Sequence, residues 1–253
     1  MDIDVRDDFG GRVRTLVMNR PAKKNALTVA MYGALADELA NAGPSSQIRA
    51  VVLTGAGDVF TAGNDIHDFV AQPPVSDDSH VVRFLKALVS FPKPVIAAVN
   101  GAAIGIGTTM LLHCDLVLAS PTARFQLPFV KLGLCPEGGS SLLLPRMLGL
   151  QRASEVLLWG EPFDARAARD MGLVNEVVEE RGLLASTASR VERLLELPPD
   201  AVAAAKELIR GPLRAELVET MLREANAFQK RLASSEAAEA FAAFVEKRKP
   251  RFV

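Results

Sequence analysis

Three glycine-rich segments of the sequence have the composition of loops that bind an anionic oxygen. They are residues 54–66, 100–107 and 132–141, and each stands where a strand-like run gives way to a helical pattern. Glycine lets backbone amides approach a ligand closely. The first amides of a helix have no partner within it and lie at the positive end of its dipole. The spacing therefore predicts main-chain donors that face a negatively charged oxygen.

The third segment also contains a carboxylic acid. Glu137 lies between Pro136 and the pair Gly138-Gly139, just before an apparent helix at residues 141–144. A carboxyl group held in this way is a candidate general acid or base. A glutamate beside two glycines is, however, more often a solvated turn residue, so these residues alone leave both interpretations open.

Phosphate-binding motifs fit the glycines less well. Gly105 and Gly107 begin a GxG pattern, but Met110 occupies its sixth position and no early strand-to-helix turn carries the motif. No GK[ST] sequence occurs, which excludes a P-loop. Asn64 and Asp65, in the first segment, are equally consistent with a binding role and with a turn that bonds to its own backbone.

The histidines and cysteines do not form a recognisable metal site. No pair among His67, His80 and His113 has the spacing of metal ligands, so we expect no metal. Cys114 and Cys135 are not part of a CxxC pair and cannot form a disulfide framework. We interpret both as small packing residues.

The elements that must hold these segments alternate between strands and helices. Residues 12–18 alternate polar and apolar side chains, as a half-buried strand does, and Thr28 is an N-cap type for a helix that ends near Ala42. Strands covered on both faces are predicted by three apolar runs, at residues 50–54, 94–100 and 115–119. The alternation favours an α/β core built from crossover units, with residues 72–79 as a loop.

The last part of the chain is predicted to be almost entirely helical. The helical pattern starts near Leu183, and residues 233–235 separate two amphipathic helices. Their apolar stripes consist of Leu217, Met221, Leu222, Ala225 and Phe228 on the first helix, and Ala237, Ala240, Phe241, Phe244 and Val245 on the second. The pattern does not decide whether a partner subunit or the body of the same chain covers these stripes.

The composition argues against several functions. The 253 residues contain 29 Lys+Arg and 30 Asp+Glu, so a net charge of −1 gives no electrostatic reason to expect nucleic acid or an anionic membrane as a partner. The apolar runs are far shorter than the ~20 residues that span a bilayer. The first residues lack the pattern of a secretory signal, and residues 251–253 are not a peroxisomal address. We therefore expect a cytoplasmic protein.

Four motifs, in order along the chain, resemble the crotonase (enoyl-CoA hydratase/isomerase) superfamily. They are Asn25-Ala26-Leu27, the run FTAGNDI at residues 60–66, the run PKPVIAAVNG at residues 92–101, and KPRF at residues 249–252. The resemblance implies an α/β fold in which residues 1–190 form a spiral of ββα units with an acyl-CoA site. Residues 191–253 would form a helical region that builds homotrimers or pairs of trimers. The CoA thioester would be the substrate, with no further cofactor.

The same resemblance implies which residues surround the thioester. The backbone amides of Asn64 and Ile106 would form an oxyanion hole, in agreement with the glycine-rich junctions that contain them. The positions that border substrate or CoA correspond here to Lys24, Ala26, Leu27, Ala62, Gly63, Asp65, Ile66, Gly105, Pro128, Phe129 and Leu134. Among these, Lys24 is placed to meet a phosphate of CoA.

The acids distinguish between the reactions of the family. The hydratase branch carries two glutamates at positions that correspond here to Thr109 and Phe129, and hydration needs both a base and an acid. Glu137 matches the place of the single catalytic glutamate of Δ3,Δ2-enoyl-CoA isomerases. We therefore expect an isomerase that converts 3-enoyl-CoA to 2-enoyl-CoA, with Glu137 moving a proton from C2 to C4. The alternatives are another reaction of the family, such as hydration, and a catalytically impaired acyl-CoA-binding member.

The strength of Glu137 as a base stays open at this stage. Apolar neighbours such as Phe129 and Leu134 would raise its pKa, whereas the N-terminus of the helix that follows would lower it.

Overall fold

The computed structural model describes residues 2–71, 79–179 and 182–252, so almost all of the loop predicted at residues 72–79 lies outside the described residues. The main sheet has the strand order β1-β2-β3-β4-β6-β9. Its strands are β1 (Ile3–Asp8), β2 (Val13–Met18), β3 (Ala50–Gly55), β4 (Val95–Val99), β6 (Leu116–Ala119) and β9 (Glu176–Val177). All neighbours in it are parallel except β1 and β2. A smaller sheet joins β5 (Ala102–Ile104), β7 (Arg124–Gln126) and β8 (Phe163–Asp164).

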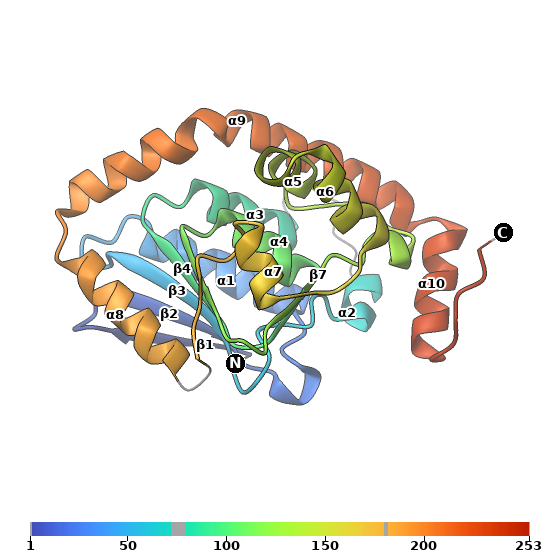
Figure 1. Cartoon of the computed structure of the whole chain (residues 1–253), viewed down its shortest axis with the longest axis horizontal. Helices are drawn as coiled ribbons and strands as arrows, with labels where there is room; N and C mark the ends of the chain where they lie inside the picture. Colours follow the sequence, from blue (N-terminus) through green and yellow to red (C-terminus); the bar gives the residue numbers. More distant parts are fainter. Residues whose placement is uncertain (1, 72–78, 180–181, 253) are drawn as a thin grey trace.

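Helices cover both faces of the main sheet (Figure 1). The helices of the described chain are α1 (Val29–Ala42), α2 (Ile66–Ala71), α3 (His80–Ser90), α4 (Ile106–Thr109), α5 (Ser140–Leu148), α6 (Leu150–Ser154), α7 (Ala165–Asp170), α8 (Leu183–Leu195), α9 (Pro199–Leu232) and α10 (Ser235–Val245). There are also three short 3-10 helices, η1 (Pro21–Lys23), η2 (Met110–His113) and η3 (Val130–Leu132), and a π-helical turn, η4 (Glu155–Trp159). The predicted cap is confirmed, because the Thr28 hydroxyl accepts from the Met31 amide at the start of α1. The helices and the mostly parallel main sheet confirm the predicted α/β class.

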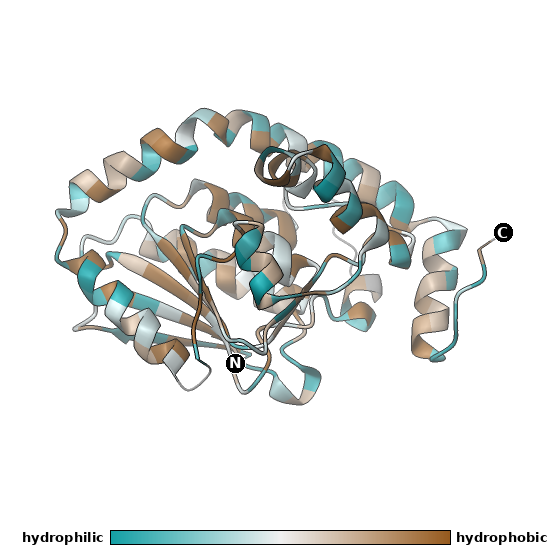
Figure 2. Ribbon diagram, viewed as in Figure 1, coloured by the Kyte–Doolittle hydropathy of each residue, from teal (hydrophilic) through white to brown (hydrophobic). Residues whose placement is uncertain are grey.

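The central strands of the main sheet are buried on both faces, in keeping with their almost entirely apolar sequences. Along β3, for example, Val51 and Leu53 pack in the larger cluster with α1 and α3, while Val52 points to the opposite face. On that opposite face, Val191 of α8 closes a second, smaller cluster. The strands accordingly carry almost continuous hydrophobic colour in Figure 2. The predicted strands at residues 50–54, 94–100 and 115–119 correspond to β3, β4 and β6.

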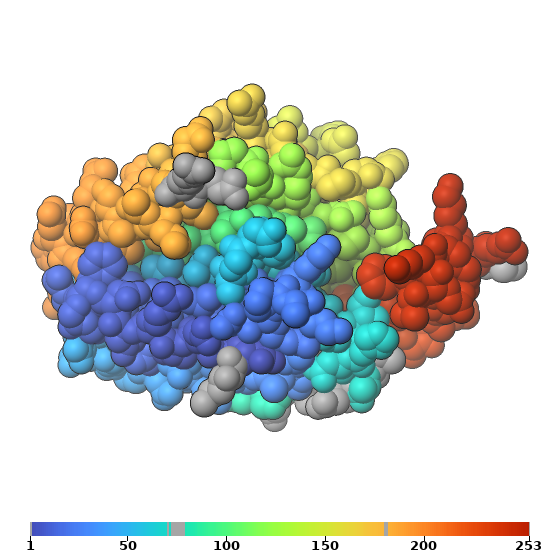
Figure 3. All heavy atoms as spheres, turned by 90° about the horizontal axis from the view of Figure 1, so that it is seen from below, coloured from blue at the N-terminus to red at the C-terminus, as the bar shows by residue number. Residues whose placement is uncertain are grey.

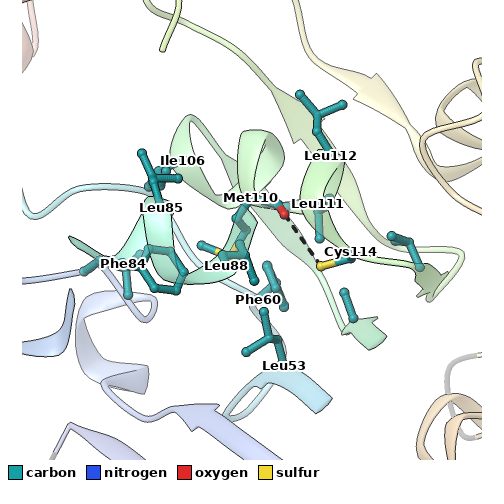
Figure 4. Close-up of a cluster of buried hydrophobic side chains, with 14 of the residues drawn as sticks. Leu53, Phe60, Phe84, Leu85, Leu88, Ile106, Met110, Leu111, Leu112 and Cys114 are labelled. Carbon is teal, nitrogen blue, oxygen red and sulfur yellow. Dashed lines mark hydrogen bonds between the residues drawn. The ribbon is translucent and has the colours of Figure 1, made fainter. Parts of the chain in front are cut away.

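Part of the larger cluster supports the start of α4. Figure 4 shows Phe84, Leu85 and Leu88 of α3 gathered around Ile106 and Met110. Ile106 is 3% exposed, so its side chain is anchored in the core. The packing of the Ile106 side chain in the core therefore holds the backbone at the start of α4 in place.

The C-terminal helices are only partly covered by the chain itself. Helix α9 runs along one side of the molecule in Figure 1, and its Leu217, Met221 and Phe228 join the larger cluster. Helix α10 projects from the body in Figure 3, with the side chain of Phe244 exposed. The predicted boundary between residues 190 and 191 falls inside α8, which packs on the sheet. Within the described ranges, no helix has both the length and the apolarity to cross a bilayer.

Candidate active site

Two main-chain amides without partners lie on neighbouring loops. The loop after β3 meets β5, the short strand that lies between β4 and Ile106, because Thr61 forms a parallel bridge with Ala103. Asn64 bridges to Leu27 in such a way that the bonds run from Leu27 to Gly63 and from Asp65 to Leu27. The Asn64 amide is left out of this ladder, and it donates to no other described residue.

The second amide is that of Ile106, the first residue of α4. Gly105 precedes it with φ +56° and ψ −118°, a backbone conformation that favours glycine, and donates its own amide to Gln126. Within the described residues the Ile106 amide has no hydrogen-bond partner, as expected for the start of a helix. Asn64 and Ile106 both line one cleft, here called the amide cleft, which is bounded by residues of α2 and α10.

A second hollow, here called the acid pocket, adjoins the amide cleft. Glu137 lines it, and Asn64, Phe69 and Phe228 line both spaces. Its remaining walls are almost entirely apolar side chains from α3 and α9: Val81, Val82, Leu85, Val218, Met221, Leu222 and Ala225. Lys86 is the one cation among the described residues that line it. The amide cleft offers donors to a carbonyl group, and the acid pocket offers apolar walls to a hydrocarbon chain.

Glu137 is the only carboxylic acid among the described residues that line these two spaces. Burial raises the pKa of its carboxyl to about 8, and the negative charge of Glu224 acts in the same direction. The hydroxyl of Thr109 donates to Glu137 Oε1 at 2.5 Å and opposes the rise by stabilising the charged form. The question left open by the sequence is thus decided in favour of desolvation.

The loop that carries Glu137 is held by hydrogen bonds from several elements. His113 Nε2 lies 2.8 Å from the carbonyl oxygen of Gly138, so this nitrogen must carry the proton, since a carbonyl only accepts. Burial lowers the pKa of His113 to about 4 and keeps the ring neutral. The hydroxyl of Ser140 donates to the carbonyl of Glu137 itself at 2.7 Å.

A buried acid on α9 completes the support of this loop. Glu224 is 7% exposed, and its carboxylate accepts from the amides of Gly139 at 2.6 Å and Ser141 at 2.9 Å. The Ser141 hydroxyl donates to the same carboxylate. Glu224 was not predicted from the sequence, because more than 80 residues separate it from the loop that it contacts. The one sequence feature that could have pointed to Glu224 is an acidic residue next to the apolar stripe of a helix.

Tyr32 of α1 was missed for the same reason. Its side chain is 1% exposed, and its hydroxyl donates to Oδ1 of Asn64. Burial raises the pKa of Tyr32 well above its usual value, and the nearby charge of Glu137 contributes to the rise. The hydroxyl therefore stays protonated and orients the Asn64 side chain.

The structure brings together most, but not all, of the predicted binding residues. Seven of them line the amide cleft: Ala62, Gly63, Ile66, Gly105, Pro128, Phe129 and Leu134. Lys24, Ala26, Leu27 and Asp65 line neither the amide cleft nor the acid pocket.

Contacts with Arg20 explain the placement of two of these four residues, Ala26 and Asp65. Its guanidinium donates to the carbonyl of Ala26 and pairs with Asp65 at 3.1 Å, which ties the chain before α1 to the loop after β3. Leu27 is 1% exposed and packs in the core, whereas Lys24 is exposed in a left-handed conformation. Asp65 thus holds the Asn64 loop in place.

Comparison with known proteins identifies the family. A family model described as enoyl-CoA hydratase/isomerase matches residues 8–253. The chain belongs to this family. It is 37% identical over 247 residues to enoyl-CoA delta isomerase 2 of Rattus norvegicus, which covers 95% of this chain but only 63% of that relative. It is 35% identical to 2,3-dehydroadipyl-CoA hydratase of Escherichia coli (strain K12), with 95% of each chain covered.

A solved structure supports the same assignment. The crystal structure of an enoyl-CoA hydratase/isomerase from Pseudoalteromonas atlantica T6c matches with a TM-score of 0.94 and 47% identity, and covers all of both chains. The chain is therefore a member of the enoyl-CoA hydratase/isomerase family with the crotonase fold, near the isomerase branch. Isomerases and hydratases occur among its relatives at similar identity, so the reaction itself has to be argued from the site.

Proposed function

We propose that this enzyme moves a double bond in an unsaturated acyl-CoA, converting a 3-enoyl-CoA to a 2-enoyl-CoA. The observation that carries the proposal is a single half-buried carboxyl, Glu137, in a pocket that adjoins the cleft of two amides without partners among the described residues. A 1,3-proton shift needs one group that takes a proton and returns it. Hydration needs a second group to activate water. Among the described residues that line the two spaces, Glu137 has no second acid to share that task.

In the proposed reaction the thioester oxygen accepts hydrogen bonds from the Asn64 and Ile106 amides, and the acyl chain enters the acid pocket. The Glu137 carboxylate removes a proton from C2, and the electron pair moves into a dienolate whose negative oxygen faces the two amides. The protonated carboxyl then gives the proton to C4, the electrons return, and a double bond stands between C2 and C3. No atom is gained or lost, and no other reactant takes part.

The environment of each group suits its step. A buried donor aimed at a developing oxyanion contributes about 10²–10³ in rate. A carboxylate whose pKa is about 8 is a stronger base than an ordinary glutamate, although only about a tenth of it is deprotonated at pH 7. The rate should therefore rise with pH and level off above about pH 8.

The decisive variant is Glu137→Gln, which keeps the shape of the side chain but cannot take up a proton. When 3-enoyl-CoA is added, the absorbance of the conjugated 2-enoyl thioester should grow about 10²–10⁴-fold more slowly than with the parent enzyme. Calorimetric titration with a saturated acyl-CoA should give an unchanged affinity. The matched control is Glu219→Gln, since Glu219 is exposed on α9, away from both spaces.

Three results would contradict this proposal. Isomerisation by Glu137→Gln at the parent rate would remove Glu137 from the reaction. A fall in absorbance when 2-enoyl-CoA is added to the parent enzyme, without isomerisation of 3-enoyl-CoA, would indicate hydration instead. Binding of acyl-CoA with neither change would indicate a protein that binds but does not react.

A further inference from the structure

Glu224 stands where the N-terminus of α5 meets α9. Its two carboxylate oxygens accept hydrogen bonds from the Gly139 amide, the Ser141 amide and the Ser141 hydroxyl. The loop also packs tightly on α9, because a Cβ at Gly139 would lie only 2.3 Å from Leu217 Cδ1. The loop that carries Glu137 is thus fastened to the helix whose Met221, Leu222 and Ala225 wall the acid pocket.

The N-terminus of α5 directly follows the loop that carries Glu137, and the Glu224 carboxylate lies against it. Unpaired amides at a helix N-terminus stabilise a negative charge, so they would lower the pKa of a glutamate that lay against them. Glu224 occupies these amides. Among the described residues, the side chain of Glu137 accepts a hydrogen bond from Thr109 alone. The base is therefore deprived of the donors that would weaken it.

We propose that Glu224 is a positioning residue for the double-bond shift. It fixes the Glu137 loop against the wall of the acid pocket, and it occupies the α5 amides so that the Glu137 carboxylate stays a strong base. This inference rests on the proposed function, since it assigns a role to Glu224 through Glu137.

Few other charged groups face Glu137. The groups around it come from five parts of the chain: Tyr32 of α1, Lys86 of α3, Thr109 of α4, His113 of η2 and Cys135 of the loop itself. Tyr32 and His113 are neutral near pH 7, and burial raises the pKa of the Cys135 thiol, which keeps it neutral as well. Lys86 is the one cation that lines the pocket in the described chain. Glu224 is accordingly the nearby anion whose removal should be felt.

The test compares two substitutions that separate charge from reach. Glu224→Gln keeps the length of the side chain and removes its charge, so the acidic limb of the pH profile of kcat/KM should move down by about 0.5–1 pH unit. Glu224→Asp keeps the charge but shortens the side chain, so kcat should fall while the limb moves to lower pH by less than in Glu224→Gln. Glu219→Gln, on the exposed face of α9, should change neither.

An acidic limb in Glu224→Gln that coincides with the parent limb would overturn the role of the charge. Parent kcat in Glu224→Asp would overturn the role in positioning. If Glu224→Gln does not fold, the Glu224→Asp arm still decides the role in positioning. Carbon-13 NMR titration of the glutamate carboxyls gives the pKa of Glu137 without any turnover, with Glu137→Gln to assign its signal. An inactive Glu137→Gln together with an unmoved limb would reject this inference alone, whereas an active Glu137→Gln would reject the proposed function.

Discussion

The two ends of the substrate-binding region are built in different ways. At the thioester end, the Asn64 and Ile106 amides are main-chain groups whose direction is set by the chain segments that follow β3 and β5. At the acid end, one side chain acts, and its pKa is set by burial and by contacts from α4 and α9. The first end is specified by local backbone geometry, and the second by residues that are distant in sequence.

This difference determines how each end should respond to mutation. A side chain substituted near the amides leaves the donors in place, so only a change of backbone conformation can remove them. A substitution near Glu137 alters its pKa directly, because the hydrogen bond to its carboxyl comes from a side chain, and side chains also hold its loop. After the loss expected for Glu137→Gln, the largest effect should therefore come from the glycine that shapes the thioester end.

Gly105→Ala should lower kcat by about 10²-fold, the effect of losing one oxyanion donor. The added Cβ would meet only Phe129 Cε1, at 3.9 Å, so the space is sufficient. The cost comes from the positive φ of 56°, which alanine resists, and relaxation of this residue turns the Ile106 amide away. Steady-state kinetics measures the loss, and titration with a saturated acyl-CoA shows whether ground-state binding survives.

Gly172→Ala is the matched control for this variant. Gly172 also has a positive φ, of 77°, with nothing within 4 Å of an added Cβ, and it lies between α7 and β9, outside both spaces. Both variants should lose stability, but only Gly105→Ala should lose activity. Equal kcat in the two variants would show that the Ile106 amide contributes nothing to the reaction.

At the acid end, Thr109→Val should move the acidic limb of the pH profile upward by about one pH unit. The Thr109 hydroxyl stabilises the charged form of Glu137, and a hydrogen bond to a charged group is worth about 1.5–3 kcal/mol. Below pH 8 the rate should fall up to about tenfold, since less of the base is deprotonated. Above the limb the parent rate should return. This shift is opposite in direction to that expected for Glu224→Gln.

Thr108→Val provides the comparison on the same turn of α4. The Thr108 hydroxyl is also buried, but it bonds to the carbonyl of Ala103 and has no contact with Glu137. Thr108→Val should lower the stability of the fold without shifting the acidic limb of the pH profile. An unmoved limb in Thr109→Val would mean that the hydrogen bond to Glu137 does not control its pKa during turnover.

The same contrast explains how much could be predicted from the sequence. The strands β3, β4 and β6 and the cap at Thr28 were predictable because hydrophobic period and cap chemistry are local signals. The glycine-rich junctions likewise indicated where free amides would lie. Glu224 and Tyr32 gave no such signal, since their importance arises only when α9 and α1 pack beside the loops. The pKa of Glu137 was equally beyond reach, because burial is a property of the folded chain.

The smallest effect on kcat is expected at Tyr32, where the thioester end and the acid end meet. Tyr32→Phe removes the hydroxyl that donates to Asn64 Oδ1 but keeps the ring that packs on Phe84, with centroids 5.7 Å apart. The Asn64 amide is still positioned by the bonds of Leu27 to its neighbours, so kcat should fall only about two- to fivefold, in line with about 1 kcal/mol for one hydrogen bond. The limb should stay in place, because Tyr32 is neutral at these pH values. A loss of 10²-fold or more, measured by the same absorbance assay, would place the hydroxyl within the proton transfer. The acid end would then contain a second proton-carrying group, and the contrast between the two ends would no longer hold.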